Sequence, residues 1–146
     1  MDLWVRISDS RGGFGVRCGT RLGRFESPED LASQFGLRSQ PNIYFAVNEH
    51  TARAILQKLL HEDMAYNSEL LSRADATALA DTFIDLFRQQ NGRYFSNGNW
   101  HLPMEQVDSR VWAHPGWTPA TDATFDGGVL ALADNVSGCA WFEDED

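Results

Sequence analysis

Two central stretches of the chain repeat apolar residues with the spacing of an amphipathic helix. In the first stretch, which Asn48 can cap, these residues stand at positions i, i+3, i+4, i+7 and i+8. They are Ala52, Ile55, Leu56, Leu59 and Leu60. The second stretch opens at Ser72, a typical N-cap residue, and ends at Asn91-Gly92. Its apolar face consists of Ala76, Leu79, Ala80, Phe83, Ile84 and Phe87. We expect both helices to pack on the same sheet.

The shorter patterns near both ends of the chain are typical of β-strands. Residues 3–8 alternate apolar and polar side chains, which predicts a half-buried strand, and residues 14–18 are expected to return as its hairpin partner. Residues 43–47 are a third strand candidate. Further on, the apolar runs 128–132 and 138–142 flank turn residues and predict a C-terminal hairpin.

A short helix and a long aperiodic segment lie between these patterns. A serine followed by a proline predicts a helix over residues 28–35. Residues 97–121 contain three prolines and three tryptophans, and we expect the tryptophans to order this segment, with one short strand over 110–112. Strands early and late with helices between them predict one α+β domain over residues 1–146. Its sheet is expected to be mainly antiparallel, with two or three amphipathic helices and the C-terminal hairpin.

Composition narrows the functional classes. The 146 residues include 12 Lys and Arg against 21 Asp and Glu, a net charge of −9, which disfavours direct binding of nucleic acid. No apolar run is long enough to cross a bilayer, and the first residues lack the pattern of a secretory signal. We therefore expect a cytoplasmic protein with no membrane partner, in which Cys18 and Cys139 stay reduced.

The residues that commonly carry catalysis do not stand in a recognisable motif. His50 and His61 fall on one predicted helix roughly 16 Å apart, too far to share a metal ion. His101 and His114 have no cysteine or carboxylate at zinc spacing, and no nucleophile motif surrounds either cysteine. The sequence favours a protein without enzymatic activity, metal or other cofactor.

Charge is distributed unevenly along the chain. Residues 1–25 carry five arginines against two aspartates, whereas no lysine or arginine follows Arg110. Residues 111–146 contain seven acidic side chains, four of them in the run 143–146 directly after two aromatic residues. A negative surface with aromatic anchors is typical of a site for a basic protein.

We predict that this partner-binding surface combines acidic residues with tryptophan anchors. The predicted residues are Trp117, Asp122, Asp126, Trp141, Glu143, Asp144, Glu145 and Asp146, with Trp100 and Trp112 as further candidate anchors.

The C-terminal third resembles small bacterial immunity proteins of polymorphic toxin systems. The resemblance lies in residues 117–122, 124–129 and 141–146, which read WTPATD, TFDGGV and WFEDED. Such proteins are the cognate inhibitors of toxins delivered by contact-dependent inhibition or type VI secretion. The resemblance implies a small, acidic, cytoplasmic protein without cofactors that binds the catalytic domain of its toxin, often a basic nuclease, and covers or distorts the active site.

Two other functions remain open. One is a small enzyme or ligand-binding domain with a pocket under residues 97–121, in which His101, His114 and Asp122 are the polar groups. A deep apolar pocket that receives two of these side chains would favour it. The other is an acidic mimic of nucleic acid, which requires carboxylates spaced along one face like phosphates.

Overall fold

The computed structural model describes residues 2–102 and 116–146, and in these residues the chain forms one α+β domain. The helices are α1 (Leu3–Asp9), α2 (Pro28–Gln34), α3 (Glu49–His61) and α4 (Arg73–Arg88). The strands are β1 (Val16–Leu22), β2 (Phe45–Val47), β3 (Arg93–Ser96), β4 (Phe125–Leu132) and β5 (Val136–Asp144). All neighbouring strands pair antiparallel in the order β1-β5-β4-β3-β2. The predicted fold class and the C-terminal hairpin, β4 with β5, are confirmed.

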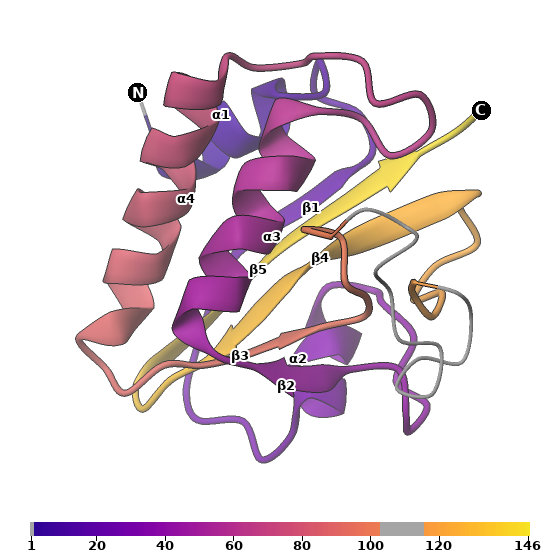
Figure 1. Ribbon diagram of the computed structural model, residues 1–146. Helices are drawn as coiled ribbons and strands as arrows, with labels where there is room; N and C mark the ends of the chain where they lie inside the picture. The colour runs from indigo at the N-terminus through magenta and orange to yellow at the C-terminus, as the bar shows by residue number, and fades with distance from the viewer. Residues whose placement is uncertain (1, 103–115) are drawn as a thin grey trace.

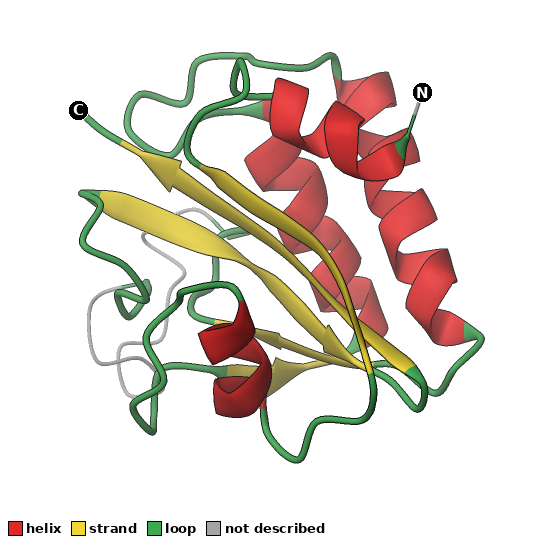
Figure 2. Cartoon of the chain, turned by 180° about the vertical axis from the view of Figure 1, so that it is seen from behind, coloured by secondary structure: helices red, strands yellow, loops and turns green. Residues whose placement is uncertain are grey.

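Helices cover both faces of the sheet. Figure 1 shows α1, α3 and α4 together on one face, and the view from behind in Figure 2 shows α2 on the other. Side chains alternate between the two faces along each strand, so β5 contributes Ala140 and Phe142 to the core under α3 and α4. It contributes Cys139 and Trp141 to the smaller core under α2.

Local capping explains the three helices that the sequence predicted. The side chains of Ser27, Asn48 and Ser72 each accept a hydrogen bond from a backbone N–H three residues later, at 3.2, 2.8 and 3.1 Å. Each predicted apolar face is buried, because the residues that repeat at helical spacing along α3 and α4 all lie in the larger core.

The prediction of a strand over residues 3–8 is wrong, because these residues form α1. Asp2 caps this helix by accepting from the Trp4 backbone N–H at 2.7 Å. Ile7 is buried, and the Trp4 ring packs edge-on against Phe83 of α4 with 5.9 Å between centroids. The alternation of Leu3, Val5 and Ile7 fits a strand equally well, so the contact with α4 decides between the two structures.

The predicted N-terminal hairpin is therefore wrong as well. Residues 16–22 form β1, which pairs with β5 in a register that sets Val16 opposite Phe142 and Leu22 opposite Val136. The third predicted strand is shorter than expected and spans Phe45–Val47. β3 was not predicted from the sequence, and the strand predicted over 110–112 lies outside the described residues.

Candidate functional site

Three aromatic side chains stack over the beginning of β4. The ring centroids of Trp100 and Trp117 are 5.4 Å apart, and those of Trp117 and Phe125 are 6.2 Å apart. Trp100 lies directly on the strand, since a Cβ built on Gly127 would overlap its indole ring. We call Trp100, Trp117 and Phe125 the aromatic cluster. It occupies the same face of the sheet that α3 covers further along β4.

Local contacts bring the two tryptophans together. The side-chain oxygen of the buried Asn97 accepts a hydrogen bond from Trp100 Nε1 at 3.1 Å. Gly98 forms a β-bridge with Trp117, and a Cβ on Gly98 would overlap the carbonyl oxygen of Gly116. Glycine at this position therefore permits the close approach of the two backbone segments that carry the tryptophans.

The aromatic cluster forms one wall of a pocket with a volume of about 280 Å³, which we call the aromatic pocket. The opposite wall is the last turn of α3 and the segment that follows it. Leu59, Met64 and Leu102 contribute apolar surface to the lining, and Lys58, Glu62 and Asp63 contribute charged groups.

Carboxylates outnumber cations around the aromatic pocket. Lys58 Nζ lies 2.5 Å from Glu62 Oε2, which is an ion pair one helical turn apart. Asp63 is a second carboxylate in the lining. Glu145 is exposed, and its carboxylate accepts a hydrogen bond at 3.2 Å from the backbone N–H of Thr124, the residue before β4 begins. In the lining itself, the two carboxylates of Glu62 and Asp63 stand against the one ammonium group of Lys58, which leaves a net negative charge.

Arg11 binds the end of α3, which forms one wall of the aromatic pocket. Its guanidinium donates to both carboxylate oxygens of Asp144, at 3.1 and 3.0 Å, and lies 4.4 Å from the ring centre of Phe142. It also donates to the backbone carbonyl oxygens of Leu59 and Glu62 at the end of α3. The side chains of Arg11 and Asp144 are only 5% and 10% exposed.

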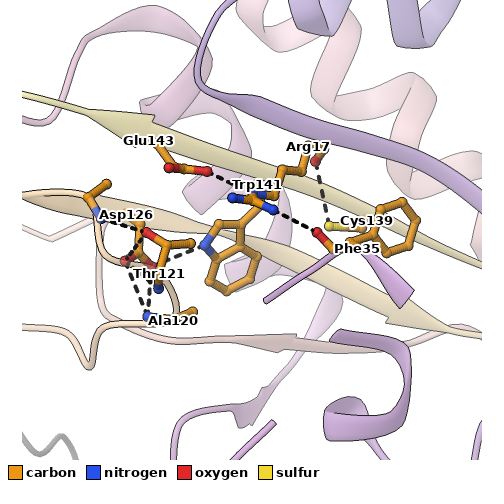
Figure 3. A network of polar contacts seen from close by, with 9 residues as sticks. Arg17, Phe35, Ala120, Thr121, Asp126, Cys139, Trp141 and Glu143 are labelled. Carbon is orange, nitrogen blue, oxygen red and sulfur yellow. Dashed lines mark hydrogen bonds and ion pairs between the residues drawn. The ribbon is translucent and has the colours of Figure 1, made fainter. Parts of the chain in front are cut away.

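Three of the six predicted acidic residues, Asp122, Glu143 and Asp144, are paired with arginines of the same chain. Besides the ion pair of Asp144, Arg17 Nε lies 2.7 Å from Glu143 Oε1 (Figure 3), and Arg38 pairs with Asp122. The side chain of Asp122 nevertheless remains 99% exposed, and Asp146 is exposed at the end of the chain. These pairs oppose the nucleic-acid mimic, because its carboxylates must act as an unneutralised row.

The prediction that Asp126 and Trp141 belong to a partner-binding surface is wrong for this structure, because both side chains are completely buried. Figure 3 shows the network that holds Asp126. Its carboxylate accepts hydrogen bonds from Trp141 Nε1, from the Thr121 hydroxyl and from the backbone N–H groups of Ala120 and Thr121, at 3.0–3.2 Å. Asn97 Nδ2 donates a further hydrogen bond at 3.0 Å. Burial raises the pKa of Asp126 despite these donors. The network anchors the segment before β4 to the sheet.

Of the candidate anchors, Trp100 and Trp117 are partly buried and both lie in the pocket wall, whereas Trp112 lies outside the described residues. The fold also places Glu145 beside Thr124, just before the beginning of β4.

Glu62, Asp63 and Phe125 were not predicted from the sequence. Glu62 and Asp63 stand far from the C-terminal acids in the chain, and the fold brings the segment after α3 to Asp144 through the backbone N–H of Met64. Phe125 stands just before the predicted hairpin.

Neither cysteine has the environment of a nucleophile. Burial, followed by the charge of Asp2, raises the pKa of the Cys18 thiol to about 11. Complete burial raises the pKa of Cys139 well above its ordinary value. Cys18 packs toward α1 and Cys139 toward α2, so the two sulfur atoms lie on opposite faces of the sheet and both are free thiols. Among the described residues, no three His, Cys, Asp or Glu side chains are grouped to hold a metal ion.

The polar groups expected under residues 97–121 do not meet in one pocket. His101 lines a separate pocket beside α3, where burial and then the charge of His50 lower its pKa. Asp122 lies outside the lining of both this pocket and the aromatic pocket. His114 lies outside the described residues. His101 and Asp122 therefore do not share the deep apolar pocket that an enzyme or ligand-binding domain under residues 97–121 would require.

No protein-family model, curated protein or solved structure matches this chain. None of the helices in the described part of the chain is long and apolar enough to cross a membrane.

Proposed function

We propose that this chain is an immunity protein that binds and neutralises a cognate bacterial toxin domain through the aromatic pocket and its acidic edge. The supporting observation is that Trp100, Trp117 and Phe125 form a partly exposed aromatic wall beside Glu62 and Asp63. Half-buried aromatic side chains in a pocket are typical anchors of protein interfaces, and a charged rim adds specificity and speeds association.

The proposed surface differs from the one expected from the sequence. Trp117, Glu145 and Asp146 remain in it, whereas Asp126 and Trp141 leave it because they are buried. Glu143 and Asp144 are paired with arginines, so they stabilise the end of β5 and contribute little net charge. Asp122 is exposed and stays available to a partner, although the positive charge of Arg38 offsets its negative charge.

The proposed partner is a basic catalytic domain, such as that of a nuclease. A domain that handles nucleic acid carries a positive active-site surface, which an acidic inhibitor can cover while its aromatic residues fill apolar contacts. Binding would block the substrate without any chemistry by the inhibitor. The protein would act in the cytoplasm, where a delivered toxin meets its substrate.

The experiment takes as the candidate toxin a domain encoded by the neighbouring upstream gene. The protein is mixed with the C-terminal domain of the secreted polypeptide encoded directly upstream, and both binding and the activity of that domain are measured. We expect stoichiometric inhibition, and rescue of cells that express the domain when this chain is co-expressed. A soluble, active upstream domain that neither binds nor is inhibited overturns the proposal, and so does an upstream gene that encodes no secreted polypeptide.

A small ligand-binding domain is the second candidate, and the aromatic pocket itself favours it. Its volume of about 280 Å³ lies just below the roughly 300–1,000 Å³ typical of small-molecule sites, and its lining is mainly apolar. A screen of metabolites by thermal shift distinguishes the two candidates. A tight small-molecule ligand without inhibition of the upstream domain favours ligand binding, and the opposite result favours the immunity protein.

A further inference from the structure

We infer that the aromatic pocket receives the guanidinium group of one arginine side chain from the partner. This inference rests on the proposed function and specifies the chemistry of the contact. It follows from the shape of the aromatic wall, from the charges around it, and from the way in which this chain binds its own arginines.

The aromatic wall places three neighbouring rings within reach of a planar cation in the pocket. Trp117 stands between Trp100 and Phe125 at interplanar angles of 39° and 32°, so neighbouring rings are tilted toward parallel and do not meet edge to face. A cation over the face of a tryptophan is attracted by the negative potential of the ring. A guanidinium group is planar and weakly hydrated, so it stacks on such a wall more readily than an ammonium group.

Two acidic residues, Glu62 and Asp63, line the same pocket as the rings. Asp63 is in the lining, and its Oδ1 accepts from the backbone N–H of Tyr66 at 2.6 Å, which fixes the position of its carboxylate. Glu62 is 20% exposed, and Lys58 engages its Oε2 oxygen. Glu145 adds negative charge beside β4. An arginine can donate sideways to carboxylates while its plane rests on a ring, because its five N–H donors lie in that plane.

The chain builds the same arrangement elsewhere with its own arginines. Arg11 lies 4.4 Å from the ring centre of Phe142 while it donates to both oxygens of Asp144. Arg21 lies 4.2 Å from the ring centre of Phe35. These internal contacts show that a guanidinium group on an aromatic ring with carbonyl or carboxylate acceptors is accommodated in this fold. The aromatic pocket offers rings and carboxylates of the same kinds.

The size of the pocket suits a single side chain. Its volume of about 280 Å³ lies just below the lower end of the roughly 300–1,000 Å³ typical of small-molecule sites. Its mainly apolar lining suits the methylene groups of an arginine, which bury their stem while the charged end meets the carboxylates.

The test uses arginine derivatives as probes and requires no toxin. The full chain, labelled with nitrogen-15, is titrated with N-acetylargininamide and, separately, with its neutral isostere N-acetylcitrullinamide. The indole N–H signals of Trp100 and Trp117 and the backbone signal of Asp63 report on the pocket. We expect saturable shifts with the arginine probe and affinity at least about fivefold weaker for the citrulline probe.

A matched pair of variants checks that the carboxylate contributes. Asp63→Asn removes one charge and keeps the oxygen that accepts from Tyr66, and it should weaken binding of the arginine probe by about threefold. Glu26→Gln removes one charge from an exposed residue just before α2, which lies on the opposite face of the sheet, and should leave binding unchanged. Equal affinity for the two probes, equal effects of the two variants, or shifts confined to other signals would overturn the inference.

The outcome is independent of the proposed function. If the upstream toxin domain is inhibited but the pocket shows no preference for arginine, then only the inference about the occupant fails. If the pocket prefers arginine but no upstream domain is inhibited, then the immunity function fails while the cation site stands.

Discussion

Arg11 and Asp144 stand 133 positions apart in the chain and form a bidentate ion pair. Nε and Nη2 of the arginine lie 3.1 and 3.0 Å from the two carboxylate oxygens. The same carboxylate accepts the backbone N–H of Met64 at 2.9 Å. The basic beginning and the acidic end of the sequence are therefore partners within the fold. Much of the charge asymmetry along the chain stabilises the domain and the wall of the aromatic pocket.

Arg11→Gln should lower the free energy of unfolding by about 3 kcal/mol, because it leaves a nearly inaccessible carboxylate without its cation. Arg38→Gln is the matched control, since its partner Asp122 is 99% exposed, and it should cost less than about 1 kcal/mol. Urea unfolding of both variants measures the difference. Equal losses would show that the Arg11 pair is no more important than a surface ion pair.

Asp126→Asn should lower the free energy of unfolding by about 2–3 kcal/mol. Both oxygens of Asp126 accept from N–H donors, so an amide group in place of either oxygen faces at least one donor. The variant should also release the segment around Ala120 and Thr121, which hydrogen exchange can detect. Exchange of the Ala120 and Thr121 amides as slow as in the wild type would contradict this role.

The stability difference between the wild type and Asp126→Asn should change with pH in one direction. The raised pKa of Asp126 means that the folded state binds this proton more tightly than the unfolded chain does. The contribution of Asp126 to stability is therefore fully present below the ordinary carboxyl pKa and declines as pH rises through the raised value. Asp126→Asn lacks this titration, so the stability gap between wild type and variant should narrow as pH rises across that interval. A gap that widens would contradict the direction of the shift.

Gly127→Ala should displace Trp100 from β4, because the added Cβ would overlap the indole ring. We expect a loss of about 1–3 kcal/mol from overpacking and a change in the near-ultraviolet circular dichroism of the tryptophans. The affinity for arginine probes should fall as well, since Trp100 belongs to the aromatic wall. An unchanged tryptophan spectrum would contradict the placement of Trp100 on this strand.

Glu145→Gln should slow association with the toxin domain by roughly two- to fivefold at low salt and flatten the salt dependence of the rate. Asp134→Asn is the matched control, because it removes one exposed acid at the turn between β4 and β5, at the opposite end of the hairpin. Screening limits the reach of each charge to about 10 Å, so position decides the effect. Stopped-flow measurements in which both variants slow association equally would contradict the placement of the interface.

The sequence predicted the elements whose signals are local. Ser27, Asn48 and Ser72 act as caps within three residues of their partners, so α2, α3 and α4 were predicted with nearly correct bounds. The α1 helix was missed because its side chains alternate like those of a strand. Its N-cap, Asp2, is a local signal, but the packing of Trp4 on Phe83 is what distinguishes the helix from a strand. No local signal shows that β1 pairs with the last strand.

The candidate site was only partly predictable for a related reason. Tryptophan density in residues 97–121 predicted that these side chains would pack, and Trp100 and Trp117 do pack together, with 5.4 Å between ring centroids. Burial, however, depends on strand register and on partners from distant elements, so the sequence could not show that Asp126 and Trp141 lie inside the protein. Net charge likewise gave no sign of which acids Arg11 and Arg17 would neutralise.

The affinity of Trp117→Leu for the upstream toxin domain, measured by isothermal titration calorimetry, tests the central claim most directly. Removing the middle ring of the aromatic cluster should weaken binding by about 30-fold or more, the effect of losing an interface anchor. Leu22→Ser is the control, because it changes an 89% exposed apolar residue at the end of β1, and should bind like the wild type. A folded Trp117→Leu protein that binds with wild-type affinity would contradict the proposal that the aromatic pocket is the toxin-binding site.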